Sequence, residues 1–168
     1  MLTILILAVV SSICLFLNRE EERYMKKDYY IASGWWQEAE IKNYETITKI
    51  LKDKGFTLFE PKYDVGTGSG GPLTLEKARE IFKGDIDGIT QCKALFADIS
   101  FSDKGVLVEI GVALANNIPV ILFDNSPRKV MNVMLAGSAK NCLRTFDDVI
   151  AFANGEDVFN LGEDVEFQ

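Results

Sequence analysis

Glu109 is the residue whose setting most directly suggests chemistry. It lies in the run from Val106 to Ala115, in which every other position is apolar or glycine. Burying an unpaired carboxylate is costly, so an apolar helix that carries one usually has a partner or a reaction for it. Two interpretations are open at this point: Glu109 points outward from a mostly buried helix, or it is held in a site near the positive end of that helix.

Three aspartates could share a site with Glu109. Asp98 ends an apolar, strand-like run, Asp103 stands where it would cap the helix of Glu109, and Asp85 lies one strand earlier in the chain. Crowded carboxylates raise one another's pKa values, which suits a pair that divides the roles of nucleophile and acid. Cleavage of a glycosidic bond with retention requires such a pair. The simpler alternatives are an ordinary helix cap for Asp103 and a structural strand end for Asp98.

The amino-acid composition excludes several classes of catalytic site and ligand. The chain of 168 residues has no histidine, which excludes histidine-based triads and histidine-ligated metals, and we expect neither a metal nor another cofactor. A net charge of −7 argues against binding to nucleic acid, whose phosphates normally meet a basic surface. Cys14, Cys92 and Cys142 are too far apart for a zinc site or a disulfide framework, so we expect small buried hydrophobic residues.

Alternating strand-like and helical runs predict the scaffold that positions these residues. Strands are expected at residues 29–32, 56–59, 94–99, 119–123 and 142–145, and helices at 38–54, 75–91, 106–115 and 147–153. Strands separated by helices form a parallel sheet with helices on both faces. The prediction is a single doubly wound α/β domain, flavodoxin-like or Rossmann-like, with a mostly parallel sheet of about five strands flanked by helices. Ligands would bind beyond the carboxyl ends of the strands.

A glycine-rich stretch at residues 66–71 could be taken for a phosphate-binding loop. It lacks both the ending of a P-loop and the spacing of a dinucleotide fingerprint. We interpret it as a surface loop or a flexible lid.

Four segments together resemble the nucleoside 2-deoxyribosyltransferase family. Residues 30–36 resemble its first strand and following loop, with an aromatic pair after glycine, and residues 84–89 resemble its helix with an active-site aspartate. Residues 103–111 match the family's Asp-x-Gly-x-x-x-Glu-x-Gly signature. Asn132-Val133-Met134 resembles a segment that reaches into the site of a neighbouring subunit. The resemblance covers residues 29–150.

The resemblance implies an exchange of 2-deoxyribosyl groups between nucleobases, through a covalent intermediate on Glu109. It implies that Tyr30 orients Glu109, and that Asp85 and Asp103 handle the base and its proton. Asn132 would hold the 5′-hydroxyl across an interface, which makes a homo-oligomer the expected assembly. The other substrate contacts are expected from Gly34, Trp35, Trp36, Asp98 and Met134. The partners would be 2-deoxynucleosides and free nucleobases.

The chain starts with a hydrophobic segment. We divide it into this segment at residues 1–18, a charged linker at 19–28 and a catalytic domain at 29–168. Residues 2–17 are either a short membrane anchor or an upstream extension of a chain whose working start is Met25. The catalytic domain is expected in the cytoplasm, with membrane attachment through residues 2–17 as the alternative.

Two other functions are alternatives to transfer. A deoxynucleoside 5′-monophosphate N-glycosidase would use the same glutamate on the same fold, but it would need cations or serines such as Ser33, Ser100 and Ser102 for the phosphate. A membrane-tethered nucleotide-binding module would bind its ligand without turnover. A variant at Glu109 separates the two enzymes from the binding module.

Overall fold

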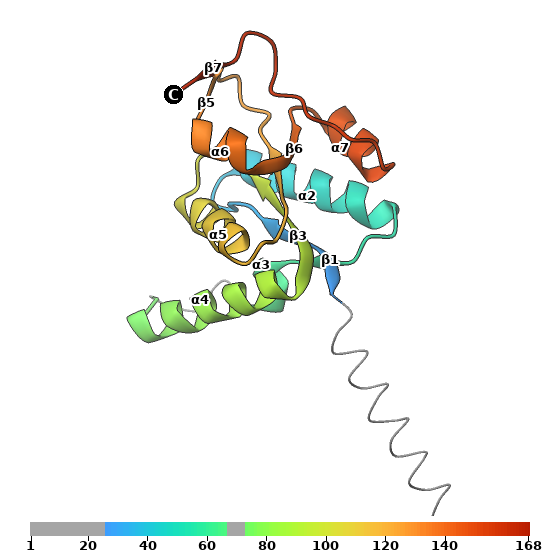
Figure 1. Ribbon diagram of the computed structural model, residues 1–168. Coiled ribbons are helices and arrows are strands. Elements are labelled where there is room, and N and C mark those ends of the chain that lie inside the picture. Colours follow the sequence, from blue (N-terminus) through green and yellow to red (C-terminus); the bar gives the residue numbers. More distant parts are fainter. Residues whose placement is uncertain (1–25, 67–72) are drawn as a thin grey trace, which may run out of the picture.

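A five-stranded parallel sheet forms the centre of the protein in the computed structural model (Figure 1). The structure describes residues 26–66 and 73–168. The predicted hydrophobic segment, Met25, Cys14 and most of the glycine-rich stretch lie outside the described residues. Within the described part of the chain, no helix is long and apolar enough to cross a membrane.

The strand order of the sheet is β2-β1-β3-β4-β6. Its strands are β1 (Lys27–Ala32), β2 (Leu58–Phe59), β3 (Cys92–Asp98), β4 (Val120–Phe123) and β6 (Ala139–Leu143). Every neighbouring pair is parallel. This is the flavodoxin-like order, so the predicted doubly wound α/β class is confirmed. The order reverses between β1 and β3, and the crevice beyond the carboxyl ends of these two strands is the expected ligand site.

Helices cover both faces of the sheet. α4 (Leu75–Thr90) and α5 (Lys104–Ala115) lie on one face, and α2 (Glu38–Asp53) and α7 (Phe146–Ala153) lie on the other (Figure 1). Side chains alternate between the faces along each strand. Tyr30 and Leu95 belong to the core under α4 and α5, whereas Ile31 and Phe96 belong to the core under α2 and α7. A strand residue can therefore contribute to a ligand site only on the face of the sheet to which its side chain points.

Cys92 and Cys142 are free thiols buried in the core, which confirms their prediction as small hydrophobic residues. Burial raises the pKa of Cys92 to about 12 and that of Cys142 to about 11. Neither thiol is therefore a nucleophile at neutral pH, because the thiolate is the reactive form.

Several boundaries differ from the predicted ones, and one short helix was not predicted. β1 begins at Lys27, inside the predicted linker, because Lys27 pairs with Cys92 at the start of β3. Pro61 begins a short helix, α3 (Pro61–Asp64), since proline is favourable at the first helical position. The last strand of the main sheet begins at Ala139, ahead of the predicted range, because α6 (Val133–Ser138) leads directly into it.

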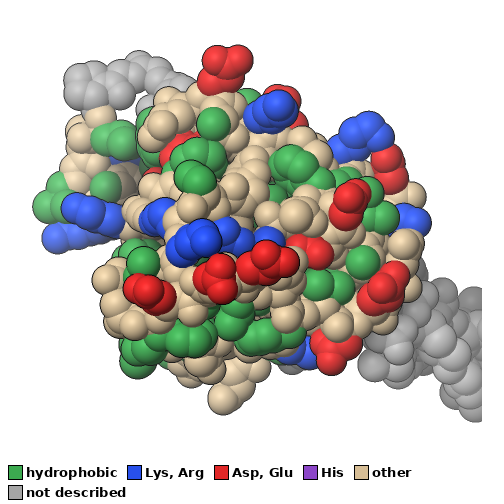
Figure 2. Space-filling model, turned by 90° about the horizontal axis from the view of Figure 1, so that it is seen from above, with side chains coloured by type: hydrophobic (Ala, Val, Ile, Leu, Met, Phe, Trp, Pro, Cys, Tyr) green, Lys and Arg blue, Asp and Glu red, His purple; other side chains and the backbone are tan. Residues whose placement is uncertain are grey.

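A second sheet, which the sequence did not predict, joins β5 (Val130–Met131) to β7 (Glu166–Phe167) in parallel. The backbone N–H of Val133 also donates a hydrogen bond to the carbonyl of Gln168. Seen from the side on which β5 and β7 lie, acidic and basic side chains stand next to one another, with hydrophobic side chains between them (Figure 2). The small sheet fixes the start of the segment that carries Asn132.

Candidate active site

A cavity of about 200 Å³ lies between α4, the start of α5 and the loop after β1. Asp85, Asp103 and Glu109 line it, so three of the four predicted carboxylates meet. The other lining residues are Ser33, Gly34, Trp35, Trp36, Pro61, Gly66, Leu73, Ile81, Gly105 and Val106. The cavity therefore collects residues from three predicted motifs at the carboxyl end of β1.

Tyr30 holds Glu109 in place. Its hydroxyl donates a hydrogen bond to Oε1 of Glu109 at 2.6 Å. Tyr30 is completely buried, and the ring of Phe59 stacks on its ring. Glu109 is partly buried, while Leu107 and Val108 beside it on α5 are exposed. The interpretation that Glu109 points outward is therefore wrong, because α5 turns this side chain toward the sheet and the cavity.

The pKa of Glu109 is raised from 4.5 to about 8. Burial is the largest cause, the negative charges of Asp85 and Asp103 add to it, and the hydrogen bond from Tyr30 opposes it. Burial also raises the pKa of Tyr30, so its hydroxyl stays protonated and can donate to Glu109. A carboxyl with a pKa near neutrality can be both a protonated acid and a carboxylate nucleophile in the same pH range.

Asp85 faces the cavity from α4. Burial raises its pKa, and the nearby hydroxyl of Tyr30 offsets part of that rise. Among the side chains of the described residues, Oδ1 of Asp85 is the one buried oxygen or nitrogen that has no hydrogen-bond partner. A buried polar atom without a partner is costly, and at a cavity wall this oxygen is placed where a water molecule or a ligand can bond to it.

Two glycines allow α4 to approach the site closely. A Cβ atom at Gly88 would lie 2.4 Å from Cε1 of Phe59, and one at Gly84 would lie 2.6 Å from Cγ1 of Val65. Both distances are far shorter than a van der Waals contact. The glycines on either side of Asp85 therefore set how deeply its carboxyl reaches toward the cavity.

Asp103 caps α5, as predicted. Its Oδ1 accepts hydrogen bonds from the backbone N–H groups of Gly105 at 2.7 Å and Val106 at 3.2 Å. These bonds satisfy two of the free N–H groups at the start of the helix. The cap fixes the first turn of α5, which precedes Glu109 on the same helix.

Glu40 shapes the loop after β1, and it was not among the residues predicted from the sequence. The side chain is 3% exposed, and its Oε2 accepts hydrogen bonds from the backbone N–H groups of Trp36 and Gln37. A Cβ atom at Gly34 would lie 2.8 Å from the same carboxyl group, so a larger residue there would displace Glu40 from these hydrogen bonds. Gln37 and Glu40 form a capping box at the start of α2, and their spacing is the signal that could have identified Glu40.

The two tryptophans of this loop have different surroundings. Trp35 packs edge-to-face against Tyr44, with ring centroids 5.8 Å apart. Trp36 is 72% exposed, although it also lines the cavity. Trp36 therefore has the free aromatic surface that a planar ligand could cover.

The described residues hold no group of three or more histidine, cysteine, aspartate or glutamate side chains that could bind a metal ion. The cavity wall instead combines two carboxyls with raised pKa values and a capping aspartate, and the buried phenol of Tyr30 bonds one of these carboxyls from behind the wall. Such a set can attack a carbon centre and move a proton.

The sequence also matches a known family along most of its length. Residues 29–160 match the family described as nucleoside 2-deoxyribosyltransferase. The chain belongs to this family. Membership places it among glycosyl-transferring enzymes, and the segments that carry Tyr30, Asp85, Asp103, Glu109 and Asn132 all fall within the matched range.

Solved structures of two proteins share the fold of this deoxyribosyltransferase-family chain. A 2-deoxyribosyltransferase from the psychrotolerant bacterium Bacillus psychrosaccharolyticus is 24% identical, with a TM-score of 0.69 over 79% of this chain and 98% of that one. A conserved protein from Enterococcus faecalis V583 is 15% identical, with a TM-score of 0.52 over 76% of this chain and 87% of that one. No curated protein matches the sequence.

Asn132 and Met134 do not reach the Glu109 cavity of their own deoxyribosyltransferase domain. They line a different cavity, between β5, α5 and α6. The side-chain oxygen of Asn132 caps α6 by accepting from the backbone N–H groups of Met134 and Leu135. Met134 is 78% exposed. Their expected contacts with substrate therefore require a second copy of the chain.

Asp98 does not join the other carboxylates of this deoxyribosyltransferase-family site, contrary to the expected convergence. Its two oxygens accept hydrogen bonds from Nδ2 of Asn43 and the backbone N–H of Ser100, each at 3.0 Å. The residue is buried on the α2 side of the sheet, because strand alternation places it on the same side as Phe96. Asp98 therefore bonds to residues on the α2 side of the sheet and does not reach the cavity of Glu109.

Proposed function

We propose that this protein transfers the 2-deoxyribosyl group of a nucleoside from one nucleobase to another, with Glu109 as the nucleophile. The observation that carries the proposal is the setting of Glu109. Tyr30 holds its Oε1, its other oxygen is free to meet a substrate, and a second acid, Asp85, lines the same cavity. Family membership supports the same reaction class.

The first half-reaction forms a covalent intermediate. In it, Oε2 of Glu109 forms a bond to the anomeric carbon of the sugar while the bond from that carbon to the base nitrogen breaks. The bonding electron pair leaves with the base, which takes a proton from Asp85. Burial raises the pKa of Asp85, which favours the protonated form that a general acid needs.

The second half-reaction regenerates the enzyme. A nitrogen of the incoming base bonds to the anomeric carbon, the bond from that carbon to Glu109 breaks, and the electron pair returns to the carboxylate. The proton that the incoming base loses passes back to Asp85. Two displacements at one carbon retain its configuration. If water attacks in place of the base, the products are free base and deoxyribose.

The charges around the cavity support a nucleoside rather than a nucleotide as the substrate. The described lining residues include three carboxylates and no lysine or arginine. A phosphate group there would meet like charges without a paired cation, which is unfavourable. These like charges disfavour a 5′-monophosphate glycosidase. Trp36 is the proposed surface for the base, and Gly34 allows the loop that presents it.

We also propose that a second copy of the chain completes each site with Asn132. Asn132 stands beside exposed apolar side chains, since Val133 is 50% and Met134 78% exposed. On α5, Leu107 and Val108 are exposed next to Glu109. Contiguous apolar surface of this kind favours association with another protein surface.

A base-exchange assay tests the proposed reaction. The full chain is incubated with deoxyinosine and adenine, and the products are separated by chromatography. We expect deoxyadenosine and hypoxanthine from the natural protein and from Glu76→Ala, which removes an exposed carboxylate of α4, but not from Glu109→Ala. Free base and deoxyribose without deoxyadenosine would show a hydrolase instead. No turnover of nucleosides or of deoxynucleoside monophosphates would contradict the enzyme proposal and leave the binding module.

A further inference from the structure

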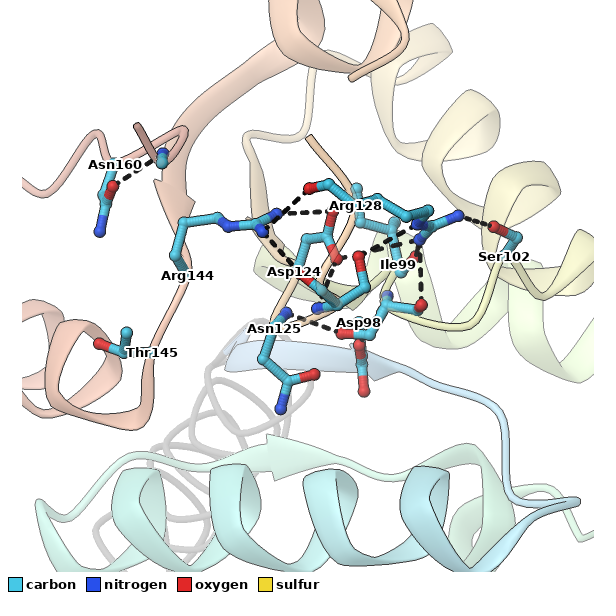
Figure 3. Close-up of polar contacts among 12 residues, drawn as sticks. Asp98, Ile99, Ser102, Asp124, Asn125, Arg128, Arg144, Thr145 and Asn160 are labelled. Atoms are coloured by element: carbon cyan, nitrogen blue, oxygen red, sulfur yellow. Dashed lines mark hydrogen bonds and ion pairs between the residues drawn. The ribbon is translucent and has the colours of Figure 1, made fainter. Parts of the chain in front are cut away.

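Arg128 connects two loops at the carboxyl end of the sheet (Figure 3). Its Nη2 donates hydrogen bonds to the backbone carbonyls of Ile99 at 2.9 Å and Ser100 at 3.0 Å. Its Nη1 donates to Oγ of Ser102 at 2.5 Å, and its Nε donates to Oγ of Ser126 at 3.0 Å. One guanidinium group therefore joins the loop after β4 to three oxygens of the loop after β3.

The loop after β3 leads directly into the helix of the nucleophile. It runs from Ile99 to Asp103, which caps α5, and Glu109 follows on that helix. Ser102 has a φ of 57°, in the left-handed region that residues with a side chain adopt at a cost. The loop therefore needs external contacts to keep its conformation, and Arg128 supplies three of them.

Arg128 is held in turn by a buried ion pair. Nη1 of Arg144 lies 2.8 Å from Oδ2 of Asp124, and Asp124 is 4% exposed. Nη2 of Arg144 donates to the backbone carbonyls of Ser126 at 2.7 Å and Arg128 at 3.3 Å (Figure 3). Arg144, which directly follows β6, thus fixes the backbone that carries the side chain of Arg128.

We propose that Arg128 is a positioning residue for the base-exchange reaction. It holds the loop between β3 and α5 so that Asp103 caps α5 and Glu109 meets Tyr30. The expected effect on rate rests on the function proposed above, while the expected effect on the loop does not. Arg128 does not line the Glu109 cavity of its own chain, so on that site it acts through the loop; it does line the separate cavity that holds Asn132 and Met134.

Lysine could not take over this role. Arginine presents several N–H donors in a rigid plane, and Arg128 uses that plane to reach four acceptors in two loops. The ammonium group of a lysine at the end of a flexible stem can bond some of these acceptors but not hold both loops at once. Arg128→Lys therefore keeps the charge while loosening the loop.

Hydrogen–deuterium exchange of the full chain tests the contact without reference to catalysis. Arg128→Ala and Arg128→Lys are compared with Arg79→Ala, which removes an exposed arginine of α4. We expect faster exchange of the amides from Ser100 to Val106 in both Arg128 variants and no change there in Arg79→Ala. Unchanged exchange in this segment would overturn the proposal, whatever the activity of the natural protein.

Base-exchange kinetics on the same variants test the positioning role. We expect kcat to fall by up to about 100-fold in Arg128→Ala, because small displacements of reacting groups have effects of that size. KM should change much less, and added guanidinium should restore part of kcat. Faster exchange of the loop with an unchanged kcat would overturn the positioning role. If the natural protein itself has no base-exchange activity, the proposed function fails, and the positioning role fails with it even where the loop contact is confirmed.

Discussion

The ring of Phe59 stacks on the ring of Tyr30, with centroids 5.4 Å apart and an angle of 13° between the planes. The hydroxyl of Tyr30 in turn donates to Glu109 at 2.6 Å. Phe59 thus restricts the ring of Tyr30 from the β2 side, so the hydroxyl is aimed before any substrate arrives. A donor fixed in advance does not need to reorganise during the reaction.

Tyr30→Phe should keep this stack but lose the hydrogen bond to Glu109. A hydrogen bond to a charged group contributes about 1.5–3 kcal/mol, so we expect kcat/KM to fall by roughly 10- to 150-fold. The bond from Tyr30 lowers the pKa of Glu109, so its loss should raise that pKa above about 8. The rise of kcat/KM with pH should then shift to higher pH than in the natural protein. A pH profile that does not move would contradict this role of the hydroxyl.

Glu109→Gln should stabilise the protein at high pH. The carboxyl has an ordinary pKa of 4.5 and a folded-state pKa of about 8. Between these values the folded protein keeps a proton that the unfolded chain has lost, so the free energy of unfolding falls as pH rises through this window. Glutamine does not ionise, so the free energy of unfolding of the variant should exceed that of the natural protein by up to about 5 kcal/mol above pH 8 and match it more closely near pH 5. Urea unfolding at both pH values measures the difference.

Asp85→Asn should reduce the rate of base release by about 100-fold or more, the range expected when a general acid is lost. The effect should be largest for bases that leave poorly without a proton. Because burial raises the pKa of Asp85, as it does for Glu109, removing the charge should not lower the midpoint of urea unfolding at neutral pH. An equal loss of rate for good and poor leaving bases would argue against Asp85 as the proton donor.

Gly88→Ala should destabilise the protein by about 1–3 kcal/mol, because the added methyl group would overlap the ring of Phe59. Gly111→Ala is the matched control. Gly111 lies in α5, and nothing lies within 4 Å of the position of its added Cβ atom. Alanine there should stabilise by about 0.5–1 kcal/mol. Thermal unfolding of both variants checks the signs, and equal shifts would contradict the close approach of α4 to Phe59.

Asn132→Ala and Glu109→Gln should complement each other if one copy of the chain completes the site of another. Each variant alone should have little base-exchange activity. When the two are expressed together, some sites combine an intact Glu109 with an intact Asn132 from the partner, and activity should return. If the mixture has no base-exchange activity although both variants are folded and associated, Asn132 does not contribute to a neighbouring site.

Much of this fold could be predicted because its main elements follow simple periodic patterns. The apolar runs of β1, β3 and β4, and the helical spacing in α2 and α4, place the parallel sheet and both helical layers. The short elements could not be found in this way. β5 and β7 have two residues each, and a pattern of period two needs more than that. β6 contains Asn141, whose buried amide bonds Asp157 and the carbonyl of Val158, so it lacks a continuous apolar run.

The candidate site could be predicted where a residue's helix face or cap decided its place, as for Glu109, Asp85 and Asp103. The prediction for Asp98 was wrong, because the sequence located the end of the strand but not the direction of the side chain there. Counting alternate residues from the buried Leu95 would have put Asp98 on the opposite face. Arg128 and Glu40 were missed because their partners are mostly backbone groups, which residue types alone do not reveal.

The hydrogen bond between Tyr30 and Glu109 joins residues 79 positions apart in the chain. It joins β1 to α5, so it forms only when these two distant segments pack together against the entropy of closing a long loop. During refolding, base exchange should therefore appear with the slowest phase that completes the central sheet, and not with early helix formation. The rate at which activity recovers would then measure the rate at which the sheet assembles.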